Sequence, residues 1–488
     1  MSLINISHLT FGYDGNADLV FEDVSFQIDT NWKLGFIGRN GKGKTTFLQL
    51  LMNQHKYQGL ITHTTAFDYF PFPIKNPDNL VIDILEMLEP HLQIWQFERE
   101  LSLLNTDSEL LYRPFSSLSS GEQTKILLAA LFLKDNHFLL IDEPTNHLDT
   151  DARKSVAKCL NSKKGFILVS HDREFLDACI DHVLSINRHS LEIEKGNFTT
   201  WKQNRDYQEH FEAQEYEKLR TETKRLAKSM AQTAQWSHQI EASKYGNDVP
   251  DRGYVGHKSA KMMKRSKTIE KRRKNALEEK SKLLKNIETS EPIKIQTLQH
   301  PKKLLVQACE LELFYDERKI TGPVQFEIQQ GDRISLSGKN GSGKSSILKL
   351  LLGKPIPYTG TLQIAGNLQI SYVLQDTNFL NGSLKSFIEQ AEIDESLFKA
   401  ILRKLDFSRE QFDKSMEFFS AGQKKKVLLA QSLCQQAHLY IWDEPLNYID
   451  IISRIQLEQM LKTCKPTMIF VEHDEAFRKN IASKNIQL

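Results

Sequence analysis

Two glycine-rich segments in this chain of 488 residues have the spacing of a phosphate-binding loop. Residues 38–45 read GRNGKGKT and residues 338–345 read GKNGSGKS, so both match GxxxxGK followed by Ser or Thr. In such a loop the glycines let backbone N–H groups turn towards phosphates, and the following helix adds its positive N-terminal end. We therefore expect two ATP sites, formed by Gly38, Arg39, Asn40, Gly41, Lys42, Gly43, Lys44, Thr45 and Thr46 and by Gly338, Lys339, Asn340, Gly341, Ser342, Gly343, Lys344, Ser345 and Ser346.

Within these loops the lysines and the hydroxyl residues have separate expected tasks. Lys44 and Lys344 would reach the β and γ phosphates of ATP. The hydroxyls of Thr45 and Ser345 would bind Mg²⁺. Because the match is repeated, and lies between a strand and a helix both times, it does not depend on one coincidence.

An acidic pair follows an apolar run in each half of the chain. Asp142 and Glu143 follow FLLI, and Asp443 and Glu444 follow LYIW. In α/β folds such positions lie at the carboxyl edge of the sheet, where ligands bind. We expect each aspartate to orient hydrated Mg²⁺ and each glutamate to polarise the water that attacks the γ-phosphate.

Each glutamate could instead be a surface acid at the end of a strand. Two features argue against this: a proline follows each glutamate, and a histidine follows 28 residues after Glu143 and 29 residues after Glu444. We expect these histidines, His171 and His473, to contact the γ-phosphate. The predicted catalytic residues are therefore the two glutamates and the two histidines.

These landmarks recur in the same order at a nearly constant distance along the chain. The offset is 300 residues for the glycine loops, 301 for the segments LSSGEQ and FSAGQK, 301 for the acidic pairs and 302 for the histidines. Four such pairs in one order indicate a duplicated domain.

Alternating strands and helices must position these residues in each copy. Residues 33–37 predict a short strand, residues 46–51 the start of a helix, and residues 138–141 a buried parallel strand. The second copy repeats the pattern at 333–337, 346–352 and 439–442. We predict an α/β fold with two tandem cassettes, each a mainly parallel sheet with helices.

The segment between the copies has a different character. It is dense in helix formers at 212–230 and 261–287, where Met262, Ile269, Ala276 and Leu283 recur every seven residues. We predict a helical hairpin with an irregular tip near 236–257, which holds three glycines and a proline. Residues 218–285 contain 19 Lys and Arg against 7 Asp and Glu, a net charge of +12 in a chain whose total is +2. A solvated spacer would usually mix the two signs, so the bias favours a phosphate-rich partner.

Composition excludes several other classes of protein. The five cysteines lie far apart without a CxxC pair, which indicates a reducing cytoplasm rather than disulfides or a zinc site. No stretch approaches the roughly 20 apolar residues of a membrane span. The N-terminal segment lacks the apolar region of a signal peptide. We expect a cytoplasmic protein, and any membrane component would be a separate chain.

The loops, acidic pairs and histidines, together with LSSGEQ and FSAGQK, resemble the ABC ATPase superfamily over both cassettes. The resemblance implies a monomer whose two cassettes close face to face around two ATP molecules. The second signature segment would then complete the first site, and the first signature segment the second site. The residues concerned are Ser420 and Gly422, and Ser119 and Gly121.

The same resemblance assigns three further residues. Tyr13 and Tyr315 stand where the family places an aromatic residue that stacks on adenine. Each alone would be read as a packing residue, but their matched positions ahead of the two loops favour stacking. Gln375 in YVLQ fits the glutamine of the family, and it completes the expected Mg²⁺ ligands with Thr45, Asp142, Ser345 and Asp443.

The sequence departs from the family pattern at the first site. Phe72 stands where the first glutamine is expected, and the second signature carries Phe419 and Ala421 in place of leucine and glycine. Both changes fall in the same composite site, whereas both glutamates are present. We therefore predict that both sites bind ATP and that they hydrolyse it at unequal rates.

Within the superfamily the chain resembles the ABC-F group. DEPTNHLD at 142–149, SHDREFLD at 170–177, and GNF at 196–198 with Trp201 are similar to first-cassette motifs of that group. The resemblance implies a ribosome-associated protein that binds the 70S ribosome with ATP bound and extends its linker towards tRNA and 23S rRNA near the peptidyl transferase centre. The predicted domains are a first cassette at 1–202, a basic linker at 203–302 and a second cassette at 303–488.

Residues 29–48 and the long linker tip resemble the antibiotic-resistance members of the Lsa/Vga kind. That resemblance implies displacement of lincosamides, pleuromutilins and group A streptogramins, with release from the ribosome on hydrolysis. The expected tip contacts are Trp236, Lys244, Tyr245 and Tyr254.

Two other functions stay open on the sequence alone. One is the ATPase subunit of a drug exporter with a separate membrane partner, and the other is a housekeeping ABC-F translation factor. The basic linker favours the ribosome over the exporter, because an exporter ATPase has no use for a phosphate-seeking arm between its cassettes.

Overall fold

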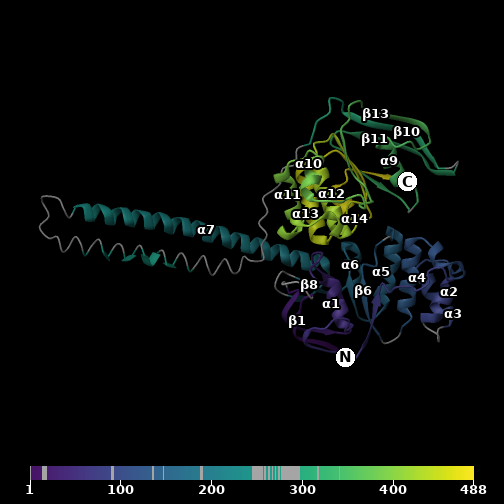
Figure 1. Ribbon diagram of the computed structural model, residues 1–488, viewed down its shortest axis with the longest axis horizontal. Helices are drawn as coiled ribbons and strands as arrows, with labels where there is room; N and C mark the ends of the chain where they lie inside the picture. Colours follow the sequence, from purple (N-terminus) through teal and green to yellow (C-terminus); the bar gives the residue numbers. More distant parts are fainter. Residues whose placement is uncertain are drawn as a thin grey trace. The chain divides into compact units, whose positions relative to one another are not determined.

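A computed structural model of the chain describes residues 2–13, 19–88, 93–134, 137–146, 148–186, 191–243, 297–315, 318–339 and 341–488, with scattered positions between 257 and 275. The chain divides into two compact units, Met1–Thr199 with Ser290–Leu488, and Thr200–Thr289. The first unit holds two cassettes, each with one large sheet, one small antiparallel sheet and helices (Figure 1).

The large sheet of the first cassette places its phosphate loop after a central buried strand. The strand order is β5-β6-β7-β3-β8-β9, and every pair is parallel except β8 with β9. Every residue of β7 is buried, as expected for a parallel strand covered on both faces. The strands are β3 (Lys33–Ile37), β5 (Ala66–Phe70), β6 (His137–Asp142), β7 (Phe166–Val169), β8 (His182–Ile186) and β9 (Leu191–Lys195).

An aromatic cluster anchors the helix that follows the first loop. Phe47 of α1 (Lys44–Leu51) is fully buried, and its ring centroid lies 6.1, 5.8 and 5.4 Å from those of Phe21, Phe26 and Phe36. Two of these partners lie on β2 of the antiparallel sheet β2-β1-β4 and one on β3, so the helix start is packed between both sheets. That sheet comprises β1 (Leu3–Phe11), β2 (Phe21–Asp29) and β4 (Gln58–Thr62).

Two of the remaining helices of the first cassette follow aspartates that cap them. Asp149 accepts from N of Ala152 at the start of α5, and Asp172 accepts from N of Phe175 at the start of α6. The helices are α2 (Val81–Leu88), α3 (Ile94–Leu103), α4 (Ser120–Phe132), α5 (Thr150–Ser162) and α6 (Arg173–Cys179), with 3-10 turns at Ser108–Tyr112 and Phe115–Ser117.

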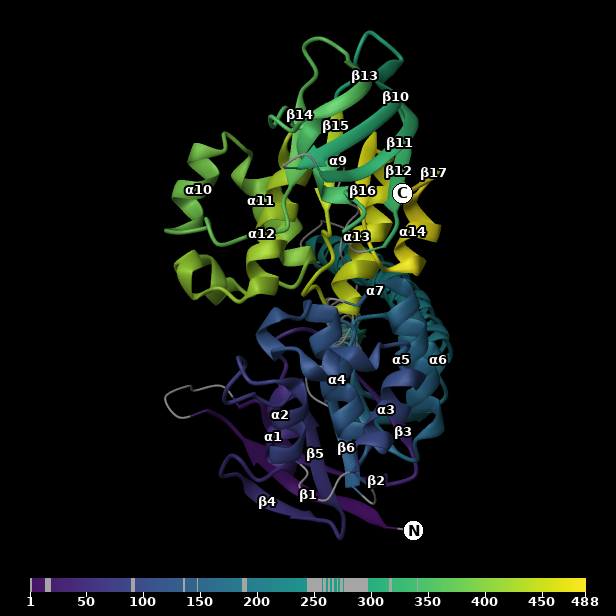
Figure 2. The ribbon, with the colours of Figure 1, turned by 90° about the vertical axis from the view of Figure 1, so that its right-hand side faces the viewer.

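The second cassette repeats this plan with a five-stranded sheet that is parallel throughout. Its order is β14-β15-β16-β12-β17, beside an antiparallel sheet β11-β10-β13, and Figure 2 shows the latter three strands next to one another. The strands are β10 (Leu304–Tyr315), β11 (Arg318–Gln329), β12 (Arg333–Ser337), β13 (Tyr358–Ile364), β14 (Ile370–Val373), β15 (Leu439–Asp443), β16 (Met468–Val471) and β17 (Lys484–Gln487).

The core of this cassette is built around β15 and the helices beside it. Tyr440 and Trp442 are buried, and Nε1 of Trp442 donates to Oγ of Ser432 at 2.9 Å, which satisfies the one polar atom of the indole. The helices are α9 (Lys344–Leu351), α10 (Leu384–Gln390), α11 (Glu395–Lys404), α12 (Ala421–Cys434), α13 (Ile451–Cys464) and α14 (Glu475–Ile481), with 3-10 turns at Arg409–Asp413 and Met416–Phe418.

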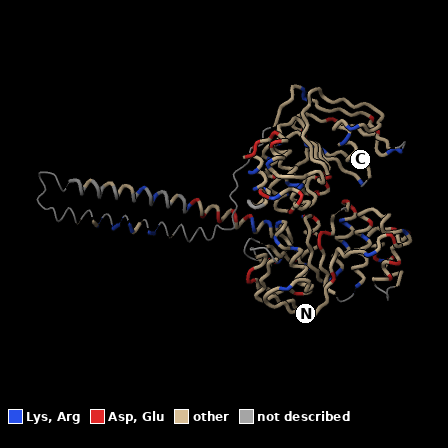
Figure 3. The backbone as a smooth tube through the Cα atoms, viewed as in Figure 1, with Lys and Arg blue, Asp and Glu red and all other residues tan. Residues whose placement is uncertain are grey.

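The second unit contains one long helix, α7 (Phe198–Ser243), which includes the predicted helix at 212–230. Lys, Arg, Asp and Glu all occur along it (Figure 3), and pairs such as Arg205 with Glu209, 2.9 Å apart, support it at i,i+4 spacing. The prediction that the irregular tip begins near residue 236 is wrong for 236–243, which are helical because glycine and proline occur only further along. Of the seven-residue repeat, Ile269 is helical, and Met262, Ala276 and Leu283 lie outside the described residues.

The predicted α/β fold with two tandem cassettes is confirmed. In the part of the chain that the structure describes, no helix has the length and apolar character needed to cross a membrane.

Candidate ATP-binding sites

Both phosphate loops turn on glycines that adopt left-handed backbone angles. Gly41 and Gly43 have φ of 76° and 91°, and Gly341 and Gly343 have φ of 80° and 90°. A Cβ on Gly43 would lie 2.4 Å from Cγ1 of Val20, so a larger residue would displace the strand beside the loop. The glycine spacing therefore reflects both the turn and the close packing of the loop.

The loop lysines are buried and turn back over their own loops. Nζ of Lys44 donates to the carbonyl oxygens of Gly38 and Arg39 at 2.7 and 3.1 Å. Lys344 has the same geometry in the second loop, at 2.9 and 2.8 Å. Burial lowers the pKa of both ammonium groups, against the pull of nearby carboxylates. A phosphate in either loop would offset this desolvation by direct pairing of charges.

A hydroxyl and a carboxyl meet beside each loop, and this donor set suits a hard divalent cation. Oγ1 of Thr45 donates to Oδ2 of Asp142 at 2.7 Å, and Ser345 hydrogen-bonds to Asp443. Burial raises the pKa of both aspartates. Among the described residues, Oδ1 of Asp443 is buried without a hydrogen-bond partner, so it is available to coordinate a cation. These oxygens therefore fit Mg²⁺.

Glu143 and Glu444 lie directly after their strands in an unusual backbone conformation. Their φ angles are 51° and 45°, and left-handed angles at residues other than glycine are concentrated at functional sites. Nε2 of His171 is 3.2 Å from Oε1 of Glu143, and Nε2 of His473 is 3.6 Å from Oε1 of Glu444. Each predicted glutamate thus lies beside its predicted histidine.

The surroundings of the two glutamates differ. Oε2 of Glu444 accepts from Nε2 of Gln375 at 2.8 Å and from Nδ2 of Asn447 at 2.6 Å. Within the described residues, Oε1 of Glu143 is buried without a hydrogen bond, and burial together with Asp142 raises the pKa of Glu143 to about 8. Burial is the largest influence on Glu444 and acts to raise its pKa, but His473, Asn447 and Lys425 together outweigh it, so the pKa of Glu444 is lowered.

A tyrosine approaches the first site from the strand that precedes Phe72. Phe72 itself lines an apolar cavity of about 330 Å³ with Pro73 and Leu85. The hydroxyl of Tyr69 donates to Oδ2 of Asp142 at 3.2 Å, and burial with that carboxylate raises the pKa of the phenol. Sequence reasoning missed Tyr69, because no motif marks a tyrosine at that position.

The first signature segment lies at the second phosphate loop. Ser119, whose hydroxyl accepts from N of Glu122 at 3.3 Å, caps α4 and directs the start of that helix towards the site. A cavity of about 520 Å³ joins the two cassettes there. It is lined by Ser119, Ser120, Gly121, Leu148 and Arg153 of the first cassette and by Ile320, Gly341, Gly343, Lys344, Ser345, Ser346, Gln375, Glu444, Asn447 and His473 of the second.

The second signature segment lies correspondingly near the first loop. A Cβ on Gly422 would be 2.4 Å from the carbonyl oxygen of Tyr448 and 3.3 Å from Nδ2 of Asn40. Nδ2 of Asn40 donates to that carbonyl at 2.7 Å. Ser420 caps α12 as Ser119 caps α4. The structure therefore brings each phosphate loop together with the signature of the other cassette.

The other predicted contacts are placed less closely. Tyr13 and Tyr315 are 41% and 40% exposed, so both rings are accessible, and the hydroxyl of Tyr13 lies 2.7 Å from Oγ1 of Thr46. Trp236 lies in α7, whereas Asn340, Lys244, Tyr245 and Tyr254 lie outside the described residues. The side chain of Gln375, itself a predicted Mg²⁺ ligand, donates a hydrogen bond to Glu444, the predicted catalytic residue of the second cassette.

Sequence reasoning also missed Arg153, which lines the second site. Its Nη1 donates to Oδ2 of Asp172 at 2.7 Å and, across the cassette boundary, to the carbonyl oxygen of His473 at 3.3 Å. The repeat held a signal for it, because Arg454 stands 301 residues later and makes the same kind of bond to Asp474.

The family model described as ABC transporter matches residues 21–146 and 321–447. Together these segments cover just over half of the chain and contain both phosphate loops and both acidic pairs. The chain therefore belongs to the ABC transporter family. It is an ATP-hydrolysing enzyme with two tandem ATP-binding domains.

Relatives extend this similarity over the linker as well. The chain is 28% identical to the ATP-binding protein Uup of Buchnera aphidicola, covering 99% of this chain and 80% of that protein. It is 27% identical to the ribosome protection protein VmlR of Bacillus subtilis, covering 100% and 86%. The crystal structure of an archaeal ribosome recycling factor, aABCE1, with stalk protein aP1 matches with a TM-score of 0.66 at 18% identity, covering 98% of this chain and 87% of that one.

Proposed function

We propose that this chain is an ABC-F ATPase that binds the 70S ribosome with ATP bound and displaces antibiotics near the peptidyl transferase centre. The observation that carries the proposal is a basic segment, residues 218–285, that joins the two cassettes in the sequence and begins within helix α7. The helix α7 has 46 residues, which at 1.5 Å each spans roughly 70 Å. Residues 218–285 carry a net charge of +12, which suits the phosphates of tRNA and 23S rRNA. Similarity to a ribosome protection protein over the whole chain supports the same assignment.

The geometry of the sites supports a cycle driven by closure and hydrolysis. Lys44 and Lys344 would bind the phosphates of ATP in their own loops. Ser420 or Ser119 from the opposite cassette would complete each site, so that bound ATP holds the two cassettes together. Glu143 and Glu444 would orient the attacking water and accept its proton, with the histidines on the γ-phosphate. Mg²⁺, when bound to the hydroxyl and aspartate pairs, would neutralise phosphate charge. Loss of the γ-phosphate would weaken the contact between the cassettes, so that they separate and the protein dissociates from the ribosome.

We assign the catalytic and nucleotide roles to the first cassette at 1–202 and the second at 303–488, and ribosome contact to the linker at 203–302. The protein would act in the cytoplasm as a monomer. Trp236, Lys244, Tyr245 and Tyr254 are the proposed contacts of the linker with tRNA and rRNA. We place the chain with the Lsa/Vga kind, whose drug classes are lincosamides, pleuromutilins and group A streptogramins.

Co-sedimentation with purified 70S ribosomes tests the proposal. The double variant Glu143→Gln, Glu444→Gln should pellet with ribosomes in ATP, with binding that weakens as salt rises. A variant with four linker residues changed to Gln, Lys264, Arg265, Lys271 and Arg272, should show a shallower decrease of log affinity with log salt concentration. The matched control replaces four exposed lysines of the second cassette, Lys303, Lys354, Lys385 and Lys414, and should leave the slope unchanged.

Either arm of this experiment can contradict the proposal. If the trapped double variant stays in the supernatant at low salt, the chain does not bind ribosomes. Expression in a susceptible host then separates resistance from housekeeping: growth in a lincosamide or pleuromutilin supports displacement. Ribosome binding without any change in drug tolerance would instead support a housekeeping translation factor.

A further inference from the structure

The residue after the catalytic histidine of the second site is a buried carboxylate with an unusual set of partners. Asp474 has a side chain only 2% exposed, and it caps α14 by accepting from N of Phe477 at 2.8 Å. Nη1 of Arg454, on α13 of the same cassette, donates to its Oδ2 at 3.1 Å. A buried carboxylate of this kind is stable only while it remains paired.

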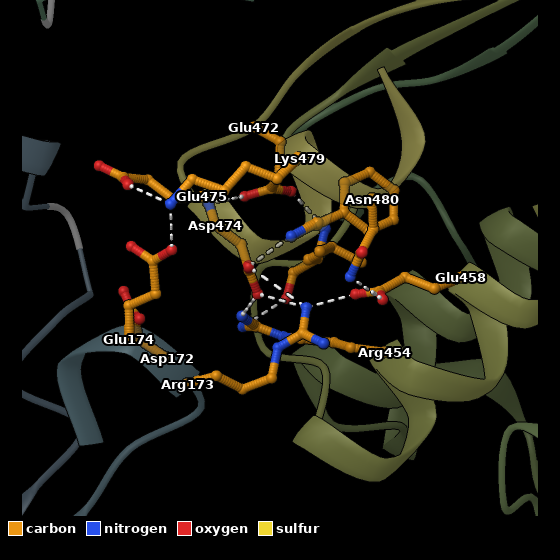
Figure 4. Close-up of polar contacts among 12 residues, drawn as sticks. Asp172, Arg173, Glu174, Arg454, Glu458, Glu472, Asp474, Glu475, Lys479 and Asn480 are labelled. Carbon is orange, nitrogen blue, oxygen red and sulfur yellow. Dashed lines mark hydrogen bonds and ion pairs between the residues drawn. The ribbon is translucent and has the colours of Figure 1, made fainter. Parts of the chain in front are cut away.

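A second arginine reaches this carboxylate from the first cassette. Arg173, two residues after His171, lies 3.3 Å from Oδ1 and 3.4 Å from Oδ2 of Asp474 and also pairs with Glu458 of α13. The side chain of Arg173 is 10% exposed, and Figure 4 shows it pointing into the second cassette between these groups. Two buried carboxylates, Asp474 and Glu458, thus lie beside two arginines. Arg173 belongs to the first cassette and Arg454 to the second.

The carboxylate is linked to the segment that carries the catalytic histidine. The backbone N–H groups of His473 and Asp474 donate to Oε1 of Glu472 at 2.7 and 3.3 Å, which holds residues 472–474 as one unit. Removing a partner of Asp474 would therefore shift the start of α14 and the imidazole that faces Glu444. A misplacement of about 1 Å at a reacting group can lower a rate about 100-fold.

In the part of the chain that the structure describes, no arginine of the second cassette pairs with Asp172, the counterpart of Asp474 in the first site. Asp172 caps α6 and pairs with Arg153 of its own cassette, as Asp474 pairs with Arg454. The position that corresponds to Arg173 is Glu475, which cannot donate to Asp172 and instead lies 3.6 Å from the more exposed Lys154. Cross-cassette support of the histidine segment by arginine is therefore one-sided.

We infer that Arg173 is a positioning residue for ATP hydrolysis in the second site, where it holds Asp474 and thereby His473 from the opposite cassette. The inference rests on the role proposed for His473. Because Arg173 follows His171 so closely, the same side chain links the histidine segment of one ATP site to that of the other. Two different cassettes in one chain can build such a link, whereas two identical second cassettes would set Glu475 against Asp474 and Glu458.

The test compares Arg173→Gln and Arg173→Lys with a matched control, Lys479→Gln. Lys479 also makes an ion pair across the cassettes, 2.8 Å from Glu174, but it is 69% exposed and does not touch Asp474. Arg173→Gln should lower kcat about 10- to 100-fold with little change in KM. Arg173→Lys keeps the positive charge but loses the planar guanidinium group that can donate to two carboxylates. Its kcat should therefore lie between those of Arg173→Gln and the unaltered chain. Lys479→Gln should change kcat by less than about twofold.

Single-turnover hydrolysis in two backgrounds then identifies the site affected. The loss caused by Arg173→Gln should be greater with Glu143→Gln, where the second site hydrolyses, than with Glu444→Gln. Equal losses in both backgrounds, equal effects of Arg173→Gln and Lys479→Gln, or an unchanged kcat would overturn the inference. If His473→Ala itself leaves hydrolysis in the second site intact, the role proposed for the histidine fails instead, and the inference with it.

Discussion

At the scale of single residues, the two glutamates proposed as catalytic occupy unlike environments. Glu444 is oriented by two amide groups, those of Gln375 and Asn447. His171, Asp142 and Lys44 surround Glu143, and the position that would supply the matching glutamine is Phe72, which lines an apolar cavity. A general base must be held in line with its water, so orientation favours the second site.

We therefore predict that Glu444→Gln lowers steady-state ATP turnover about 100-fold or more, and that Glu143→Gln lowers it less. The physical reason is that two amide side chains hold the carboxylate of Glu444 in one orientation, whereas among the described residues no amide side chain does so for Glu143. Phosphate release from the two single variants at saturating ATP provides the measurement. Equal losses would show that the difference in hydrogen bonding does not set the rates.

At the scale of elements, the helices that follow the two acidic segments begin at matched aspartates with different surroundings. Asp149 caps α5 through N of Ala152 and is half-buried. Asp450 caps α13, has a fully buried side chain, and pairs at 3.0 Å with Lys426, which is itself buried. Both aspartates therefore cap a helix, but Asp450 also neutralises a buried lysine, whereas Asp149 pairs with none that the structure describes.

Asp450→Asn should lower the free energy of unfolding of the second cassette by about 3 kcal/mol, because Lys426 would keep its burial without its partner. Asp149→Asn is the matched control and should cost less than about 1 kcal/mol, since asparagine caps helices well. Urea unfolding followed by tryptophan fluorescence, with Trp442 in the second core, measures both. A similar cost for the two variants would mean that the ion pair adds nothing to the cap.

At the scale of the whole molecule, the contact between cassettes depends on buried charges. Besides Arg173 with Asp474, it includes the partly buried pair of Arg39 with Asp406, 2.8 Å apart. Burial alone would raise the pKa of Asp474, but Arg173 and Arg454 outweigh it, so the pKa is lowered. A carboxyl with a lowered pKa in the folded state stabilises that state fully above its unfolded pKa of about 4 and loses this effect as pH falls through the folded value.

We accordingly expect this contribution to be constant from about pH 7 to pH 5 and to decline below about pH 4. The groups that face Asp474 are Arg173, Arg454, Glu458 and Glu472, and the two arginines keep their charge throughout. The urea midpoint measured from pH 7 to pH 3 should fall less steeply in Asp474→Asn than in the unaltered chain. Parallel profiles would show that Asp474 is not a source of the acid sensitivity.

The sequence by itself determined the two phosphate loops, the acidic pairs, the histidines and the α/β plan of each cassette. These features lie within short strand–loop–helix segments, where glycine angles and apolar runs act locally, and the repeat showed them twice. It also predicted a helix at 212–230 but ended it too early, because it treated residues 236–243 as part of the tip.

Only the tertiary structure decided what lies around these residues. The bond of Tyr69 to Asp142, the bond of Gln375 to Glu444 and the contacts of Arg153 and Arg173 with the second cassette join residues from 69 to 320 positions apart. Gln375 was marked by the segment YVLQ, but Tyr69 and the two arginines carry no local signature, since an arginine or tyrosine can have many roles on a helix or strand. Burial and distance set their electrostatics; for Tyr69 and Gln375 these arise when each cassette folds, and for the two arginines when the cassettes pack against one another.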